Sequence, residues 1–293
     1  MRCWFLSPLV ALARAVARLP QPALLALGSA LSVLLWPLLG RRRRIAAINL
    51  ALCYPELDAR TRRALLRANQ RATVQGALEL LRAWYAPDAL LDGMGSVDGL
   101  PHLRDALASG HGVLLMTGHF THTELAVRLL SRALGAPIGG VIRHNNSPCL
   151  EQEFARARGR VFGATIEKKD LRGLLRELRA GRAMAYSADQ DFSYHNAFVP
   201  FFGVPASTLV TAPELVRRGN ATMLSFFFHR DAGGHYRITI APAWPDWMEG
   251  DRANAAAIYM DALEAYVRQH PDQYLWVHRR FKTRPDGEPS PYG

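Results

Sequence analysis

One short segment combines a histidine and a carboxylate at a spacing that could support acid–base chemistry. Residues 117–124 read TGHFTHTE and follow a short apolar run. The ring of His119 has an ordinary pKa near neutrality, so it could remove a proton from a hydroxyl group. A carboxylate bonded to that ring would fix its tautomer and stabilise its protonated form. We therefore expect His119 to act as a general base and Glu124 to orient it, across a turn that leads into a helix.

The spacing of these residues is also compatible with other interpretations of the segment. Thr121 and Glu124 have the spacing of a helix capping box, with Thr121 at the N-cap. His119 could be a buried, hydrogen-bonded histidine without a catalytic role. His119, His122 and His144 could share a metal ion, but no further ligand has a recognisable spacing and the three cysteines contain no CxxC pair. We therefore expect no metal site.

The elements around this segment alternate between strands and helices. Apolar runs of strand length at 112–117, 137–143 and 183–188 are separated by amphipathic helical patterns, and the runs 222–229 and 235–241 flank a glycine-rich turn that predicts a hairpin. This order predicts an α/β fold with a mixed, mostly parallel sheet flanked by helices. Ligands bind such sheets beyond the carboxyl ends of the strands, which is where residues 118–124 fall.

The positive charge of the chain is concentrated at its N-terminus. The 293 residues carry a formal net charge of +11, and 49% of them are hydrophobic, which excludes a disordered chain. Seven arginines and no acidic residue fall within residues 1–44. Because the basicity is not spread over the folded part, it favours an anionic membrane surface as partner and argues against nucleic acid.

The N-terminal segment also contains an uncharged apolar run. Residues 23–39 carry no charge and are followed by Arg41–Arg44. A run of this length is near the lower limit for crossing a bilayer, about 17–25 residues, so it could span the membrane or lie in its interface. The alternative is a helical hairpin buried in a soluble core. We expect an N-terminal hydrophobic membrane-anchor helix at 1–44, a helical lead-in at 45–95, and an α/β domain at 96–293 on the cytoplasmic side.

Taken together, several motifs resemble those of a known family, the late (secondary) acyltransferases of lipid A biosynthesis of the lauroyl/myristoyl type. That family belongs to the glycerolipid acyltransferases marked by an H-x4-D/E motif. The resemblance covers essentially the whole chain. The segments that carry it are NLALCYPEL at 49–57, the H-x4-E motif at 118–124, DQD at 189–191 with FVPFFGVPAST at 198–208, and QYLWVHRRFKTRP at 273–285.

The resemblance implies a reaction and a location. It implies a glycerolipid acyltransferase-like fold at the bacterial inner membrane, with the active domain on the cytoplasmic side. It implies transfer of a fatty acyl group from an acyl carrier protein thioester to a hydroxyl of a lipid A precursor, an anionic lipid, without a cofactor.

The resemblance also assigns residues to the site. His119 takes the role of base and Glu124 that of its orienting carboxylate. Arg143 is expected to bind anionic or acyl-donor groups, and Asp189 to lie close to the catalytic pair. A basic cluster at the C-terminal motif could meet phosphates or the carrier protein, or could be a solvated surface. The expected substrate-binding residues are Arg143, Asp189, Gln190, Asp191, Arg279 and Arg280.

This sequence departs from the family pattern around the site. The usual Phe-Gly-Asn-Trp between histidine and glutamate is replaced at 120–123, the Tyr-Arg-Pro motif at 142–144, and the glycine expected soon after DQD is missing at 192–193. The base and its carboxylate are retained, so the departures concern the substrate more than the reaction. Two alternatives follow: an acyltransferase for another lipid, such as an aminolipid, or a non-catalytic lipid-binding relative.

Overall fold

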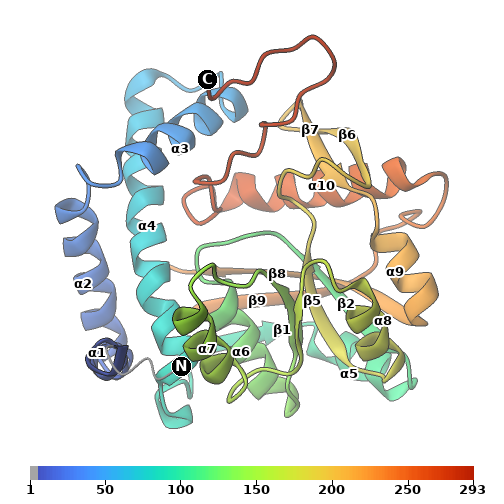
Figure 1. The fold of residues 1–293 in the computed structure, drawn as a ribbon, viewed down its shortest axis with the longest axis horizontal. Helices are drawn as coiled ribbons and strands as arrows, with labels where there is room; N and C mark the ends of the chain where they lie inside the picture. The colour runs from blue at the N-terminus through green and yellow to red at the C-terminus, as the bar shows by residue number, and fades with distance from the viewer. Residues whose placement is uncertain (1–5) are drawn as a thin grey trace.

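The computed structural model describes residues 6–293 and shows helices packed around a central sheet (Figure 1). The helices are α1 (Ser7–Ala17), α2 (Gln21–Leu34), α3 (Gly40–Cys53), α4 (Ala59–Tyr85), η2 (Asp88–Leu90), α5 (Leu100–Ala108), α6 (Thr123–Leu134), α7 (Pro148–Arg158), α8 (Leu171–Arg179), α9 (Ala212–Gly219) and α10 (Arg252–Gln269). The strands are β1 (Gly95–Asp98), β2 (Gly112–Thr117), β3 (Gly139–Ile142), β4 (Thr165–Glu167), β5 (Ala183–Ser187), β6 (Asn196–Phe201), β7 (Val204–Leu209), β8 (Ala221–Arg230) and β9 (Tyr236–Pro242).

The main sheet has seven strands in the order β1-β9-β8-β2-β5-β3-β4. All neighbouring pairs are parallel except β8 and β9, which form an antiparallel hairpin. The predicted α/β fold with a mixed, mostly parallel sheet and flanking helices is therefore confirmed, as is the predicted hairpin. Strand β1 was not predicted, because its four residues contain only one strongly apolar side chain.

A second, two-stranded sheet lies outside the main one. Strands β6 and β7 pair in antiparallel fashion through a two-residue turn at Phe202 and Gly203, both of which have positive φ, as hairpin turns of this length require. These strands were not predicted from the sequence, because Pro200 and Pro205 fall in the two strands and face each other across the pair. Phe202 tolerates the unusual backbone because its ring is buried between Tyr54 and Trp276.

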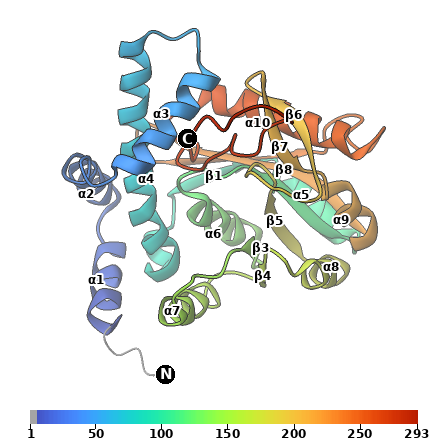
Figure 2. The ribbon, with the colours of Figure 1, turned by 45° about the horizontal axis from the view of Figure 1, so that its top comes forward.

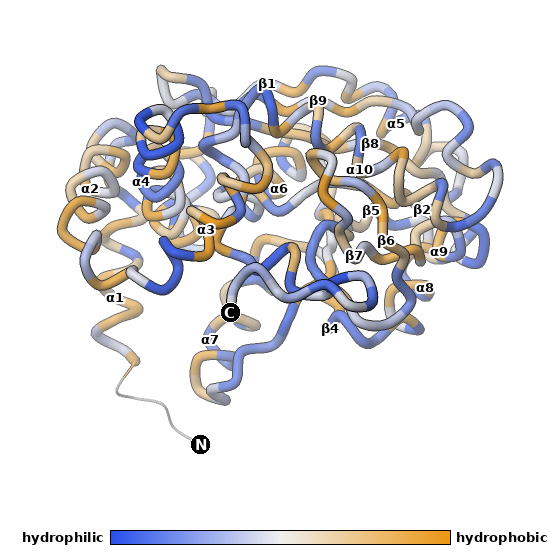
Figure 3. Tube along the Cα trace, turned by 90° about the horizontal axis from the view of Figure 1, so that it is seen from above, coloured by the Kyte–Doolittle hydropathy of each residue, from blue (hydrophilic) through white to orange (hydrophobic). Residues whose placement is uncertain are grey.

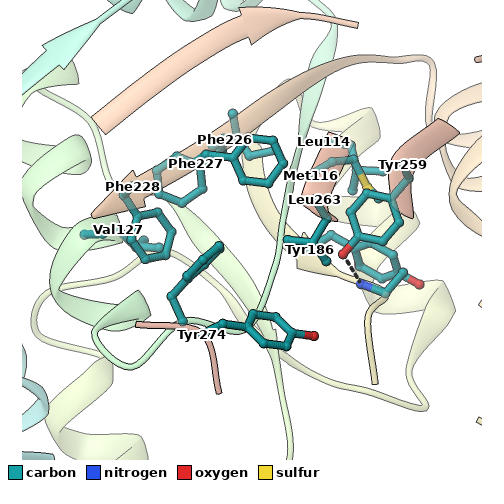
Figure 4. Packing of buried hydrophobic residues seen from close by; sticks show 14 of the residues in the cluster. Leu114, Met116, Val127, Tyr186, Phe226, Phe227, Phe228, Tyr259, Leu263 and Tyr274 are labelled. Carbon is teal, nitrogen blue, oxygen red and sulfur yellow. Dashed lines mark hydrogen bonds between the residues drawn. The ribbon is translucent and has the colours of Figure 1, made fainter. Parts of the chain in front are cut away.

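The core is built on β2, whose six residues are all buried. A parallel strand covered on both faces reads as a continuous apolar run, which is why it was recognisable in the sequence. In Figure 4 the rings of Phe226–Phe228 from β8 and the side chains Tyr259 and Leu263 from α10 pack around this strand. The Tyr259 hydroxyl accepts a hydrogen bond from the Ala188 backbone and donates one to the Thr117 carbonyl, so it ties α10 to the ends of β2 and β5.

The N-terminal helices pack on α4 at one flank of the sheet. Helices α1, α2 and α3 all contact α4, and Figures 1 and 2 both place α1 and α2 on the side of α4 that faces away from the strands. Asp58 caps α4 as expected, since its carboxylate accepts a hydrogen bond from the Thr61 backbone. Helix α3 runs across the boundary expected at residue 44.

The apolar run 23–39 is not one helix. Helix α2 ends at Leu34, a turn follows, and α3 begins at Gly40. None of the helices within residues 6–293 has both the length and the apolar character needed to cross a bilayer. Several large apolar side chains of this region are nevertheless exposed, namely Leu9, Leu12, Val33, Leu34 and Leu38.

Candidate active site

Three neighbouring parallel strands bring the predicted residues to one edge of the sheet. Strand β2 is followed by Gly118 and His119, β5 by Ala188 and Asp189, and β3 by Arg143. Because β2, β5 and β3 are adjacent and parallel, their carboxyl ends lie together. Residues separated by up to 70 positions in the chain therefore share one site.

The carboxylate bonded to His119 is that of Asp189, not that of Glu124. The Nδ1 atom of His119 lies 2.6 Å from Asp189 Oδ1, and the His119 backbone N–H donates to Asp189 Oδ2 over 2.9 Å. Tyr274 also donates its hydroxyl to Oδ2. Asp189 is almost fully buried, whereas 35% of the His119 side chain is exposed. The ring is thus anchored at Nδ1. Its Nε2 atom has no hydrogen-bond partner within residues 6–293 and can face a substrate in the cavity that His119 lines.

The contact with Asp189 changes the acid–base properties of His119. Burial lowers the pKa of His119 and the negative charge of Asp189 raises it, with a net pKa above the ordinary value. For Asp189, burial raises the pKa and the His119 ring lowers it, with a net pKa well below the ordinary value. Burial raises the pKa of Tyr274 well above its usual range, so its phenol stays protonated and can donate to Asp189.

The loop that carries His119 is held by two distant segments. The His119 carbonyl accepts a hydrogen bond from the Leu275 backbone, and the Thr121 N–H donates to the Gln273 carbonyl. On the other side, Gly76 of α4 lies so close that a Cβ atom there would overlap the Thr121 carbonyl. A Cβ on Gly118 would likewise overlap the buried Leu263 side chain, so this glycine serves close packing against α10.

Glu124 lies at the same site but has other partners. Arg158 binds its carboxylate from the end of α7, with Nη2 2.7 Å from Glu124 Oε1, and the Trp84 indole N–H donates to Oε2. Among the described residues, no hydrogen bond or ion pair joins Glu124 to His119. The expectation that Glu124 orients the ring is therefore corrected: the first turn of α6 directs its carboxylate toward α4 and α7, and Nδ1 is already occupied by Asp189.

The capping-box interpretation is wrong as well. Helix α6 begins at Thr123 with His122 at the N-cap position and no side-chain cap. It is His122, not His119, that is the buried histidine of this segment, with 2% of its surface exposed.

His119 and Glu124 both line a cavity of about 320 Å³. Arg143 and Arg158 also line this cavity, and so do the apolar side chains of Val127, Ile138, Val141, Phe162 and Phe192. A cavity lined by a histidine, by cations and by apolar side chains could hold a polar reacting group together with part of a hydrocarbon chain.

Comparison with known proteins agrees with this chemistry. The family model described as bacterial lipid A biosynthesis acyltransferase matches residues 1–283. The chain belongs to that family. It is 32% identical to the lipid A biosynthesis lauroyltransferase of Escherichia coli K12, with 94% of this chain and 91% of the relative covered. It is 35% identical to the palmitoleoyltransferase of the same organism, with 94% and 90% covered, and 26% identical to its myristoyltransferase, with 85% and 78% covered.

The other residues expected to bind substrate in this lipid A acyltransferase fall into two groups. Arg143 and Gln190 line the cavity beside His119. Asp191 does not line it: its carboxylate accepts hydrogen bonds from the backbone and hydroxyl of Thr283, and its N–H donates to His278 Nε2. Asp191 therefore ties the DQD segment to the C-terminal motif, and the expectation that it contacts substrate is not supported by these contacts.

The two arginines expected to bind substrate in the C-terminal basic cluster, Arg279 and Arg280, also differ in their surroundings. Arg280 is only 2% exposed and donates to the Ser207 carbonyl, the Thr208 hydroxyl and the Gln190 carbonyl. A guanidinium so enclosed cannot reach a phosphate at the surface, so its expected role in binding is corrected to joining the DQD segment to β7. Arg279 is half-buried, with its guanidinium 5.7 Å from the Tyr292 ring centre.

Two residues of the acyltransferase site could not be found from the sequence. Arg158 appeared only as one of several arginines on a helix, and Tyr274 as one letter of a long motif. The sequence carried no signal for Arg158, and the only signal for Tyr274 was the resemblance. Their partners lie 34 and 85 positions away in the chain. Within residues 6–293, no cluster of three potential metal ligands is present, and the suggested set of His119, His122 and His144 is not assembled.

Proposed function

We propose that this acyltransferase moves a fatty acyl group of the lauroyl/myristoyl class from an acyl carrier protein thioester to a hydroxyl of a lipid A precursor. The observation that carries the proposal is the His119–Asp189 pair, whose histidine lines the cavity. A histidine with Nδ1 bonded to a buried carboxylate keeps its other nitrogen, Nε2, as a proton acceptor.

In the proposed reaction the acceptor hydroxyl attacks the thioester carbonyl directly. His119 Nε2 takes the hydroxyl proton as the new C–O bond forms, and Asp189 stabilises the charged ring. The C–S bond then breaks, and the leaving thiolate receives the proton from His119. General-base assistance of this kind contributes about 10²–10⁴-fold to a rate.

Arg158 is the proposed donor to the oxygen that becomes negative in this step. Its Nη1 atom is buried and has no hydrogen-bond partner among the described residues, and the side chain lines the cavity with His119. Glu124 would hold this guanidinium in place through Nη2. A buried donor without a hydrogen-bond partner lowers the stability of the folded protein unless a ligand accepts its hydrogen bond. This supports a role for Arg158 in binding an anionic oxygen.

The location of the acyltransferase is also part of the proposal. The apolar wall of the cavity suits an acyl chain, and Arg143 suits an anionic group of the lipid or donor. The exposed apolar side chains of α1 and of the α2–α3 turn, next to Arg41–Arg44, suit a helix pair lying in the interface of the inner membrane from its cytoplasmic side. The carrier protein would deliver the thioester to the open side of the cavity.

The test is a transfer assay with purified protein, an acyl carrier protein thioester, and either a hydroxylated lipid A precursor or an aminolipid. We expect an ester product on the lipid A precursor, identified by mass spectrometry, and loss of at least about 10²-fold in rate for His119→Ala. A folded His119→Ala protein with normal turnover would exclude His119 as base. Product only on the aminolipid, or none with the wild type, would favour the alternative functions.

A further inference from the structure

A second cavity lies away from the catalytic one, between the end of α2 and the first half of α4. Its volume is about 520 Å³, and it shares no residue with the cavity beside His119. It is lined by Ser29, Ser32, Val33, Trp36, Pro37, Arg67, Gln70 and Arg71. The proposed reaction uses none of these residues.

Several polar groups that line this cavity could bind a ligand. Gln70 is 93% buried (7% exposed) and donates Nε2 to the Ser32 carbonyl, but its Oε1 atom is buried without a hydrogen-bond partner. A buried amide oxygen is an acceptor that needs a donor. Arg67 and Arg71 are exposed, one helical turn apart on α4, and neither has an acidic partner within 4.0 Å among the described residues.

The apolar side of the cavity continues onto an exposed hydrophobic surface. Val33, Leu34 and Leu38 are 76%, 69% and 77% exposed. Figure 3 shows α1 and α2 coloured largely as hydrophobic on the outer flank of the molecule. Trp36 is held at the turn by Arg43, whose guanidinium lies 4.5 Å from the ring centre. A tryptophan beside an arginine at the border of an apolar surface is typical of a membrane interface.

We propose that this cavity binds the headgroup of an anionic phospholipid that carries a free hydroxyl, as phosphatidylglycerol does. The phosphate would pair with Arg67 and Arg71, the hydroxyl would donate to Gln70 Oε1, and the acyl chains would follow Val33 and Pro37 into the bilayer. The inference rests on the proposed membrane location and adds a specific lipid contact that would fix the orientation of α2 and α4 on the membrane.

The experiment measures binding of the full chain to phosphatidylcholine vesicles that contain equal fractions of either phosphatidylglycerol or phosphatidylmethanol. Both additives carry one negative phosphodiester, but only the first has a headgroup hydroxyl. Arg67→Gln/Arg71→Gln is compared with Arg60→Gln/Arg63→Gln, which removes the same charge from exposed positions of α4 outside the cavity. Gln70→Met removes the acceptor, together with the Nε2 donor to the Ser32 carbonyl, with little change in size.

We expect wild-type binding to be roughly 2–10-fold tighter to phosphatidylglycerol than to phosphatidylmethanol, as one hydrogen bond allows. Gln70→Met should abolish that preference, and the Arg67/Arg71 change should weaken binding roughly 10-fold more than the Arg60/Arg63 change. Equal losses from the two arginine pairs, or no preference in the wild type, would overturn the site. Transfer to a detergent-dispersed acceptor should survive the Arg67/Arg71 change. If the wild type itself fails to transfer there, the proposed reaction fails independently of the vesicle result.

Discussion

The protonation of His119 depends on one buried carboxylate. Because the pKa of His119 is raised, the neutral base needed for transfer is lost as pH falls through a value above the ordinary one of about 6.5. In Asp189→Asn that charge is gone while burial still lowers the pKa. We therefore expect the rising limb of the pH profile of kcat/KM to move to lower pH. We also expect kcat to fall about 10²–10⁴-fold.

A matched control lies two residues further on. Asp191→Asn alters a carboxylate whose only hydrogen-bond partner among residues 6–293 is Thr283, so the rising limb should stay where it is in the wild type. An unshifted limb in Asp189→Asn, measured on folded protein, would contradict the assignment of Asp189 as the partner of the base.

Glu124 can be distinguished from Asp189 by the same measurement. Glu124→Gln leaves the Arg158 guanidinium without its carboxylate at a position where only 12% of that side chain is exposed. In the described part of the chain no hydrogen bond links Glu124 to His119. We therefore expect kcat to fall roughly 10²-fold, as when a group that stabilises charge is misplaced, and the rising limb of the pH profile to stay unchanged. A shift as large as that of Asp189→Asn would instead show that Glu124 governs the base.

At the scale of elements, the site depends on how closely α4 approaches the loop after β2. Gly76→Ala would place a methyl group on the Thr121 carbonyl, and a backbone atom cannot rotate away. We expect a loss of stability of about 1–3 kcal/mol and a larger loss of activity, because the His119 loop must shift. Gly40→Ala is the control, since a Cβ there meets nothing within 4 Å. Equal transfer rates in Gly76→Ala and wild type would show that the loop position is not critical.

The C-terminal motif acts as a second element that holds the site. Asn49 of α3 donates its amide to the carbonyls of Trp276 and His278, and Tyr292 donates its hydroxyl to the Asn49 side chain. The same motif supplies Gln273 and Leu275 to the His119 loop. The N-terminal and C-terminal motifs are therefore parts of one structural unit, although more than 200 residues separate them.

For the whole molecule, buried neutral histidines predict acid sensitivity. Burial lowers the pKa of His278 to about 4, and that of His122 well below its ordinary value. Unfolding frees these rings to take up protons below about pH 6.5, so they favour the folded state above that pH and this stability is lost as pH falls toward 4. The raised pKa of His119 acts in the opposite direction.

We therefore expect the melting temperature of the protein to fall steadily from pH 7 to pH 4.5, with a contribution on the order of 1 kcal/mol for each such histidine. His278→Gln keeps an acceptor for the Asp191 N–H but does not titrate, so its melting temperature should depend less on pH. A melting temperature that is constant over this range, or rises toward acid, would contradict the neutral state of these rings.

The sequence by itself determined the fold class and the family, and it predicted His119 as the base. Periodic apolar patterns are local, so β2, α6 and the β8–β9 hairpin could be recognised from neighbouring residues alone. His119 was recognisable because it follows a buried strand and precedes a helix. Strand β1 and the β6–β7 hairpin were not, because their signals are too short or interrupted by proline.

Only the tertiary structure decided which groups meet. The spacing of His119 and Glu124 suggested a pair, yet the direction of a side chain at a helix start depends on what packs against it. Adjacent parallel strands bring Asp189 to the ring, and α7 brings Arg158 to Glu124. Arg280 was expected to bind phosphate, but it is buried and donates hydrogen bonds inside the protein. Hydrogen bonds and charge pairs act over a few ångströms. The number of residues between two positions in the sequence does not tell how far apart their side chains lie in the fold.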